Sequence, residues 1–248
     1  MSGHSHFATI KRQKGLKDAA KGKVFSKMGR AISIAVKTGG GGDPDSNYKL
    51  RMAVDTARAA NMPKDTIERA ISKAQSEAQN LEEVIYEGFG PSGVGIMVLV
   101  TTDNRNRTSQ EMKNIFERGG GNLAGPGSVA FNFELQGLIT VKKSNNTEEQ
   151  MLLLIDAGAE DIQDTKDVFE AYVLPDKLAQ IKDKLVASGF VIDSFSLIQK
   201  PKTFVNIAEL SVVSKILKLL ESFDDHDDVQ AVYSNFDAPE EILNQVKE

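Results

Sequence analysis

The chain has 248 residues and no cysteine; 40% of the residues are hydrophobic, 26% are charged, and the net charge is −5. Such values are typical of a globular protein of about one to three domains, and they exclude collagen-like, mucin-like and fully disordered chains. Without cysteine the chain has no disulfide scaffold, thiolate nucleophile or cysteine-ligated zinc site, and without a long apolar stretch or a signal-like segment we expect a cytoplasmic protein.

The N-terminal quarter predicts a basic arm followed by a small helical bundle. Residues 1–15 have no hydrophobic period, whereas apolar residues recur on one helical face from Asp18 to Lys37. Glycines 39–42 end this helix, Asp43-Pro44-Asp45 begins a second one, and Pro63 begins a third. Three amphipathic helices with short connections are typical of a bundle.

After a polar linker at 75–83, short apolar strand patterns alternate with helical ones. We expect strands at 94–100, 128–133, 138–142, 161–163, 168–174, 190–198, 203–207 and 229–233, and helices at 106–118, 147–157, 175–188 and 208–223. Residues 137–198 then hold a β-α-β-β-α-β set, and the segments on either side supply a second one.

The predicted fold class is α+β, with an N-terminal helical bundle followed by two ferredoxin-like α/β domains, one inserted in the other. The expected boundaries are 1–78 for the basic arm and bundle, 79–134 plus 203–248 for the split domain, and 135–202 for the inserted domain. This assignment depends on the order of the elements alone, because no internal sequence repeat supports it.

Basic residues are concentrated at the N-terminus. Residues 1–37 contain nine Lys or Arg and one acid, whereas residues 79–248 carry a net charge of −13. Clustered cations attract phosphate backbones and release their counterions. A solvated helix face with a basic tail is the alternative, but so one-sided a charge favours binding. The predicted phosphate contacts are Lys11, Arg12, Lys14, Lys17, Lys21, Lys23, Lys27 and Arg30.

A second cluster, Asp103-Asn104-Arg105-Asn106-Arg107-Thr108, lies between a predicted strand and a predicted helix. Exposed backbone amides and two guanidiniums, those of Arg105 and Arg107, can hold a phosphate at such a place. Alternatively, Asn104 or Asp103 caps the helix and the arginines pair with nearby acids. Both interpretations stay open from the sequence.

The acidic run Asp224–Asp228 contains His226, one of three histidines. Hard carboxylate oxygens can bind a divalent cation, but the EF-hand spacing and its central glycine are missing, so a solvated acidic turn is the preferred interpretation. No metal site and no cofactor is predicted. We expect no enzymatic activity either, because no nucleophile, base or metal set is recognisable.

Several longer segments follow one another along nearly the whole chain. They include GHSHFATIKRQKG, GKVFSKMGRAISIAVKTGG, DPDSNYKLRMAVDTARAANMPKDTIERAI, TDNRNRTSQEMKNIF and DDVQAVYSNF, in this order. Together they resemble one known family, the YebC/PmpR family. The resemblance implies a helical N-terminal domain and two α/β domains, one inserted in the other, and a DNA-binding transcriptional regulator of the bacterial cytoplasm. The family also includes a mitochondrial translational activator of cytochrome oxidase and bacterial members that act on ribosomes stalled at proline runs.

The expected function is therefore non-enzymatic regulation through nucleic-acid binding, with DNA as the first partner and ribosomal RNA as the alternative. In either case the basic arm and first helix would contact phosphates, because backbone contact is better supported here than base readout. The oligomeric state stays open.

Overall fold

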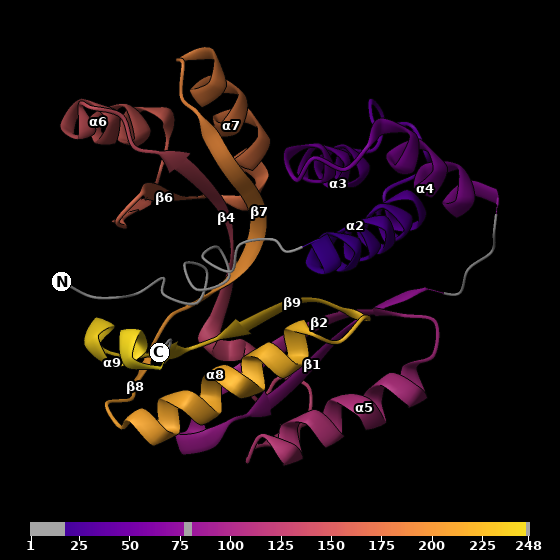
Figure 1. The fold of residues 1–248 in the computed structure, drawn as a ribbon. Helices are drawn as coiled ribbons and strands as arrows, with labels where there is room; N and C mark the ends of the chain where they lie inside the picture. The colour runs from indigo at the N-terminus through magenta and orange to yellow at the C-terminus, as the bar shows by residue number, and fades with distance from the viewer. Residues whose placement is uncertain (1–17, 77–80, 247–248) are drawn as a thin grey trace.

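The computed structural model describes residues 18–76 and 81–246, which form a helical region and two four-stranded antiparallel sheets with helices (Figure 1). The helical region contains α2 (Asp18–Thr38), α3 (Tyr48–Ala59) and α4 (Lys64–Ser76). The three helices predicted from the hydrophobic periodicity of the N-terminal quarter are thus confirmed. Their buried faces form an apolar cluster that includes Ile32, Leu50 and Ile67.

Asn47 explains why α2 ends and α3 begins where they do. Its side-chain oxygen accepts a hydrogen bond of 3.0 Å from the backbone N–H of Leu50, which caps α3. Its amide nitrogen donates to the carbonyl oxygens of Ala35 at 2.9 Å and of Gly41 at 2.7 Å. Gly39 is required beside it, since a Cβ there would lie 1.9 Å from the side-chain oxygen of Asn47.

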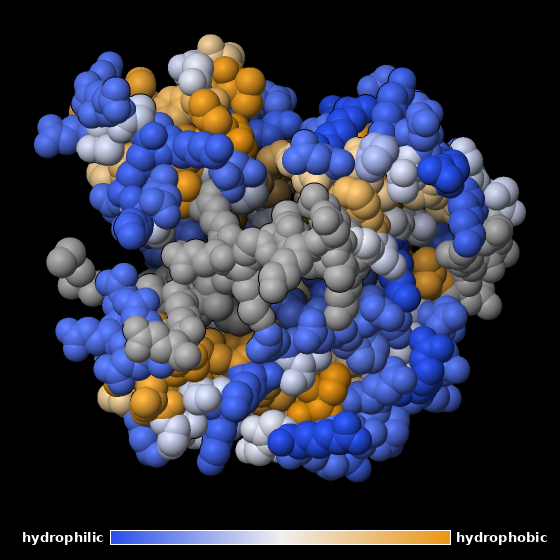
Figure 2. Space-filling view, viewed as in Figure 1, coloured by the Kyte–Doolittle hydropathy of each residue, from blue (hydrophilic) through white to orange (hydrophobic). Residues whose placement is uncertain are grey.

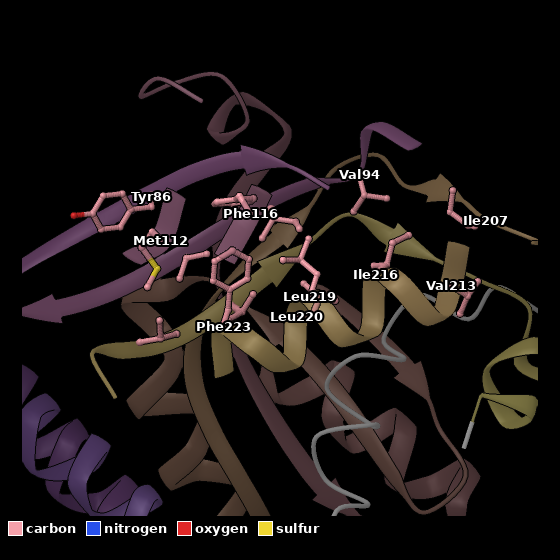
Figure 3. Close-up of a cluster of buried hydrophobic side chains, with 14 of the residues drawn as sticks. Tyr86, Val94, Met112, Phe116, Ile207, Val213, Ile216, Leu219, Leu220 and Phe223 are labelled. Carbon is pink, nitrogen blue, oxygen red and sulfur yellow. The ribbon is translucent and has the colours of Figure 1, made fainter. Parts of the chain in front are cut away.

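The first sheet has the strand order β3-β1-β2-β9 and is covered on one face by α5 and α8 (Figures 1 and 3). The rings of Phe116 and Phe223 meet edge to face in the core, with centroids 4.6 Å apart. The elements are β1 (Glu82–Phe89), β2 (Gly95–Thr102), α5 (Arg105–Arg118), β3 (Asn122–Ala124), α8 (Leu210–Asp224) and β9 (Val229–Ser234).

The second sheet has the strand order β5-β6-β4-β7, and α6 and α7 pack on it over a separate core that includes Ile139, Phe169 and Leu185. Its elements are β4 (Phe133–Lys142), α6 (Thr147–Ala157), β5 (Asp161–Asp164), β6 (Val168–Val173), α7 (Leu178–Ala187) and β7 (Ile192–Pro201). Exposed apolar side chains gather on α6 and α7, among them Leu152 and Val186 (Figure 2).

Short elements complete the described chain. They are the parallel pair β8 (Val205–Asn206) and β10 (Phe236–Asp237), the helix α9 (Glu240–Gln245), and three 3-10 turns at Pro91–Gly93, Ala130–Asn132 and Pro175–Lys177. Within the described residues no helix combines the length and the apolar character needed to cross a membrane.

The prediction of a strand at residues 128–133 is wrong. Residues 130–132 form a 3-10 turn, and Phe133 already begins β4 of the second sheet. The reason is Glu87, whose carboxylate accepts hydrogen bonds from the backbone N–H groups of Gly127, Val129 and Ala130 at 2.7–2.8 Å. A segment whose N–H groups are held by one side chain cannot use them in a sheet ladder.

The polar linker expected at 75–83 also ends too late, since β1 begins at Glu82. The sequence did not predict β1 as a strand, and it did not predict β3, β10 or α9. In β1 the exposed Glu82 and Glu83 and the buried Glu87 interrupt the apolar pattern that marks the other strands.

Candidate nucleic-acid interface

Two predicted phosphate contacts on α2, Lys27 and Arg30, are directed towards the acidic loop at residues 224–228. The ammonium of Lys27 donates a hydrogen bond of 2.7 Å to the carbonyl oxygen of Asp224 and lies 4.0 Å from its carboxylate. The guanidinium of Arg30 forms an ion pair with Oδ1 of Asp228, which is 198 residues away in the sequence. Lys27 and Arg30 are thus turned towards acidic residues of the same chain.

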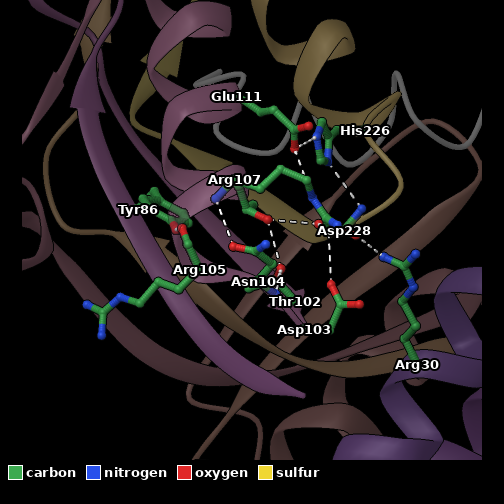
Figure 4. Close-up of polar contacts among 11 residues, drawn as sticks. Arg30, Tyr86, Thr102, Asp103, Asn104, Arg105, Arg107, Glu111, His226 and Asp228 are labelled. Atoms are coloured by element: carbon green, nitrogen blue, oxygen red, sulfur yellow. Dashed lines mark hydrogen bonds and ion pairs between the residues drawn. The ribbon is translucent and has the colours of Figure 1, made fainter. Parts of the chain in front are cut away.

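Asp228 is the centre of this contact, and its side chain is only 8% exposed (Figure 4). Its second oxygen, Oδ2, accepts hydrogen bonds from Nη2 of Arg107 at 3.1 Å and from the hydroxyl of Thr108 at 2.9 Å. Because Thr108 donates to Asp228, the 2.8 Å contact between Thr102 and Thr108 has Thr102 as its donor. Two guanidiniums and a hydroxyl therefore share one buried carboxylate.

This environment lowers the pKa of Asp228 below its ordinary value. Burial by itself would raise that pKa, but the hydrogen bonds from Thr108, Arg30 and Arg107 favour the charged carboxylate and outweigh the burial. The carboxylate is therefore ionised at neutral pH, and it gives the arginine side chains a fixed negative partner.

The order of the elements explains why Asp228 meets Arg107. Asp228 lies directly before β9, and its carbonyl oxygen accepts a 2.9 Å hydrogen bond from the N–H of Thr101, near the end of β2. The turn 103–108 follows β2 at the same sheet edge. Since β2 and β9 are antiparallel, the end of β2 lies beside the start of β9, and the acidic loop and the N-terminus of α5 therefore lie side by side.

The cluster at 103–108 combines features of both open interpretations. The side chain of Asn104 accepts a 3.1 Å hydrogen bond from the N–H of Arg107 and so caps α5. Arg107 pairs with Asp103 at 3.0 Å as well as with Asp228. Both arginines are exposed, but Arg105 extends away from the cluster (Figure 4). Among the described residues it is the arginine of this turn that is placed to meet an external anion.

The other predicted phosphate contacts belong to the part of the chain for which no side chains are described. Four of them lie outside the described residues: Lys11, Arg12, Lys14 and Lys17. Lys21 and Lys23 belong to α2, but only their backbone is described. Their role in binding stays a prediction.

The preferred interpretation of the acidic run as a solvated turn is right for the exposed Asp227 and wrong for the buried Asp228. Potential ligand atoms of Glu111, His226 and Asp228 lie within 4.8 Å of one another. However, Nδ1 of His226 accepts a 3.1 Å hydrogen bond from the N–H of Asp228, so Nε2 carries the proton and donates to Glu111 at 3.0 Å.

A metal ion would need the lone pair that Nδ1 of His226 already uses. It would also approach the guanidiniums that already hold the oxygens of Asp228. The hydrogen bonds of these three groups therefore favour a support for the carboxylate over a metal site.

Comparisons with known proteins give this chain a family. A family model described as the TACO1/YebC protein N-terminal domain matches residues 5–77, and one described as the TACO1/YebC second and third domain matches residues 81–236. The chain belongs to the TACO1/YebC family. The family resemblance of the sequence motifs is thereby confirmed.

Relatives match over almost their whole length. Proteins named "Probable transcriptional regulatory protein" are 45% identical in Dictyoglomus turgidum and 44% identical in Aquifex aeolicus, covering 99% of this chain and 100% of each relative. A crystal structure of a conserved hypothetical protein from Aquifex aeolicus superposes with a TM-score of 0.89 at 44% identity, covering 96% of this chain and 99% of that one. The Aquifex aeolicus protein therefore has the fold described above.

Sequence reasoning missed Asp228 and Thr108 as partners of the basic residues. The available signal was the position of Asp228 at the end of an acidic run and immediately before a β-branched strand. That position places a carboxylate at a sheet edge, but it does not name the cation that will meet it.

Proposed function

We propose that this chain is a non-enzymatic regulator of transcription that binds DNA through the cations of its N-terminal region. The observation that carries the proposal is the name "Probable transcriptional regulatory protein", which belongs to relatives that are 41–45% identical over at least 98% of this chain. The nine Lys and Arg of residues 1–37 support it, because a duplex attracts such a cluster through its phosphates.

The turn at the N-terminus of α5 supports a second basic element in the proposed interface. Arg105 is exposed at the N-terminus of α5, and Lys27, Arg30 and Arg107 converge beside it on the acidic loop. A phosphate backbone that follows α2 towards this point would pass several cations in succession. Phosphate contacts from Lys11, Arg12, Lys14, Lys17, Lys21, Lys23, Lys27, Arg30, Arg105 and Arg107 are thus the proposed interface.

The test is the salt dependence of DNA binding by the full chain, measured by fluorescence anisotropy with a labelled duplex. If about five cations contact phosphates, the logarithm of the affinity falls with the logarithm of the salt concentration at a slope of about −4 to −5. Lys11→Ala/Arg12→Ala/Lys14→Ala is expected to flatten this slope by up to about three units.

A control variant removes the same charge elsewhere. Lys113, Lys215 and Lys218 are exposed on α5 and α8, so Lys113→Ala/Lys215→Ala/Lys218→Ala should leave the slope unchanged. Equal slopes in both variants would remove the arm from the interface. Absence of salt-dependent binding to any duplex would refute the proposal. Crosslinking in cells that recovers ribosomal RNA and no promoter DNA would replace DNA by RNA as the target.

We also propose that residues 135–202 form a ferredoxin-like domain inserted in a second one, made of 79–134 and 203–248. The order β5-β6-β4-β7, with α6 and α7 in the connections, supports the inserted unit. The flanking sheet takes β1, β2 and β3 from before this segment and β9 from after it.

A further inference from the structure

We propose that the acidic loop 224–228 competes with DNA for the cations of α2, so that the contact between α2 and this loop opens when DNA binds. The inference rests on the proposed function, and it adds to it an autoinhibitory contact within the chain. Its centre is Asp228, whose carboxylate occupies the position beside Arg30 that a phosphate would otherwise take.

The chemistry of the contact is that of a phosphate site. A guanidinium binds the oxygens of carboxylates and phosphates through the same kind of charge-assisted hydrogen bond. Arg30 makes this bond to Oδ1 of Asp228, and Lys27 makes a comparable one to the carbonyl oxygen of Asp224 at 2.7 Å. While these bonds exist, the two side chains are not available to DNA.

The two sides of the contact belong to different parts of the molecule. Arg30 lies on α2, whose apolar residues pack against α3 and α4 in their own cluster. Asp228 is fixed to the first sheet by Thr108 and Arg107, and by its carbonyl oxygen, which pairs with the N–H of Thr101. When α2 separates from the loop, Asp228 therefore keeps its other partners and Arg30 loses its own.

The polar nature of this boundary makes such a separation feasible. The apolar cluster of the first sheet includes no described residue of α2, α3 or α4, and Lys27 and Arg30 contact the loop through ion pairs and hydrogen bonds. Contacts of this kind between domains permit relative motion, because opening them exposes little apolar surface. The helical region also contacts the second sheet unit, where Lys182 of α7 pairs with Asp55 of α3 at 3.1 Å and Met52 of α3 packs against the apolar core. We expect this contact to persist while α2 separates from the loop.

The decisive experiment compares two neutral variants of the loop in the full chain. Asp228→Asn removes the charge that holds Arg30, and Asp227→Asn removes the same charge from an exposed position one residue away. If the closed contact leaves about 10–30% of the molecules competent, Asp228→Asn binds duplex DNA roughly three- to ten-fold tighter than Asp227→Asn. Equal affinities for the two variants would overturn the proposal.

A second substitution separates competition from a general change in the loop. In an Arg30→Gln/Arg107→Gln background the gain from Asp228→Asn should disappear, since neither of the guanidiniums that Asp228 holds is left to be released. A gain that persists in this background would mean that Asp228 acts by another route and would also overturn the proposal.

A distance measurement leaves Asp228 in place, in case its variant does not fold. The natural chain has no cysteine, so spin labels can be attached at Lys37→Cys, on α2, and Lys218→Cys, on α8, both of which are exposed. Saturation with duplex DNA should lengthen the distance between the labels. An unchanged distance at saturation would overturn the proposal, whereas failure of every variant and of the natural chain to bind DNA would refute the proposed function instead.

Discussion

Replacing Glu87 by glutamine is expected to lower the free energy of unfolding, because one buried carboxylate holds the loop that leads from the first sheet to the second. Glu87 is 6% exposed on β1. Its Oε1 accepts a hydrogen bond from the N–H of Gly127 at 2.7 Å, and its Oε2 accepts from Val129 at 2.7 Å and from Ala130 at 2.8 Å. Within the described residues no cation forms an ion pair with this carboxylate, and three backbone amides stabilise it.

The magnitude follows from the number of acceptors that remain. A glutamine amide has one oxygen, which can keep the pair of bonds from Val129 and Ala130, while its nitrogen then faces the N–H of Gly127 as a second donor. The variant loses one charge-assisted bond entirely and the charge in the other two. Since a bond to a charged group contributes about 1.5–3 kcal/mol, we expect Glu87→Gln to cost about 2–4 kcal/mol.

The effect should depend on pH in a defined direction. Burial alone would raise the pKa of Glu87, but the three backbone N–H groups outweigh it and lower that pKa below its ordinary value. A carboxyl whose pKa is lowered by folding stabilises the protein above its unfolded pKa, and this contribution disappears as the pH falls through the folded pKa. The difference between natural chain and variant is thus full at neutral pH and vanishes in acid.

Urea denaturation at several pH values measures this difference, with Glu83→Gln as the control because Glu83 is exposed on the same strand. Hydrogen exchange of the Gly127, Val129 and Ala130 amides should accelerate in Glu87→Gln and stay unchanged in Glu83→Gln. Surface substitutions usually change the free energy of unfolding by less than about 0.5 kcal/mol. If the two variants differ by less than this at neutral pH, the hydrogen bonds from residues 127–130 to Glu87 do not stabilise the fold.

Three further outcomes are expected. Gly121→Ala should destabilise the chain by about 1–3 kcal/mol or more, because its Cβ would lie 2.2 Å from the carbonyl oxygen of Phe89, whereas Gly125→Ala, with no atom within 4 Å, should be nearly neutral in thermal unfolding. Phe116→Ala should cost about 3–5 kcal/mol, also by denaturation, because the ring is fully buried. Burial raises the pKa of Tyr233 to about 12, so Tyr233→Phe should remove a phenol transition near pH 12 from an ultraviolet pH titration.

The helices and most strands could be predicted because their burial is periodic. In α2, for example, Ile32 and Val36 are buried one turn apart, and the glycines after it end the helix. Strand β1 could not be predicted in this way. Its Glu87 is buried for a reason that lies in residues 127–130, and nothing within the strand itself marks a carboxylate as buried.

The candidate site also has a part that the sequence predicts and a part that it does not. Local sequence identified Arg30 as part of a basic helix and Arg107 as part of a strand-to-helix turn, and the cap by Asn104 follows from spacing alone. That both arginines meet Asp228 could not be predicted, because the two pairs join residues 198 and 121 positions apart. Contacts over such separations depend on how the helical region and the first sheet pack together, and a single sequence carries no pattern for that packing.

The loop contact also bears on which anions α2 can bind. Asp228 is part of the same molecule as Arg30, so its effective concentration is high and does not fall on dilution. A single phosphate that offers Arg30 one comparable bond gains little by replacing it. A duplex presents phosphates in a row and releases counterions at each contact, so it can offset the loss of the loop contact with bonds to Lys27 and to neighbouring cations. An internal carboxylate at this position therefore favours long polyanions over small ones, without any contact to a base.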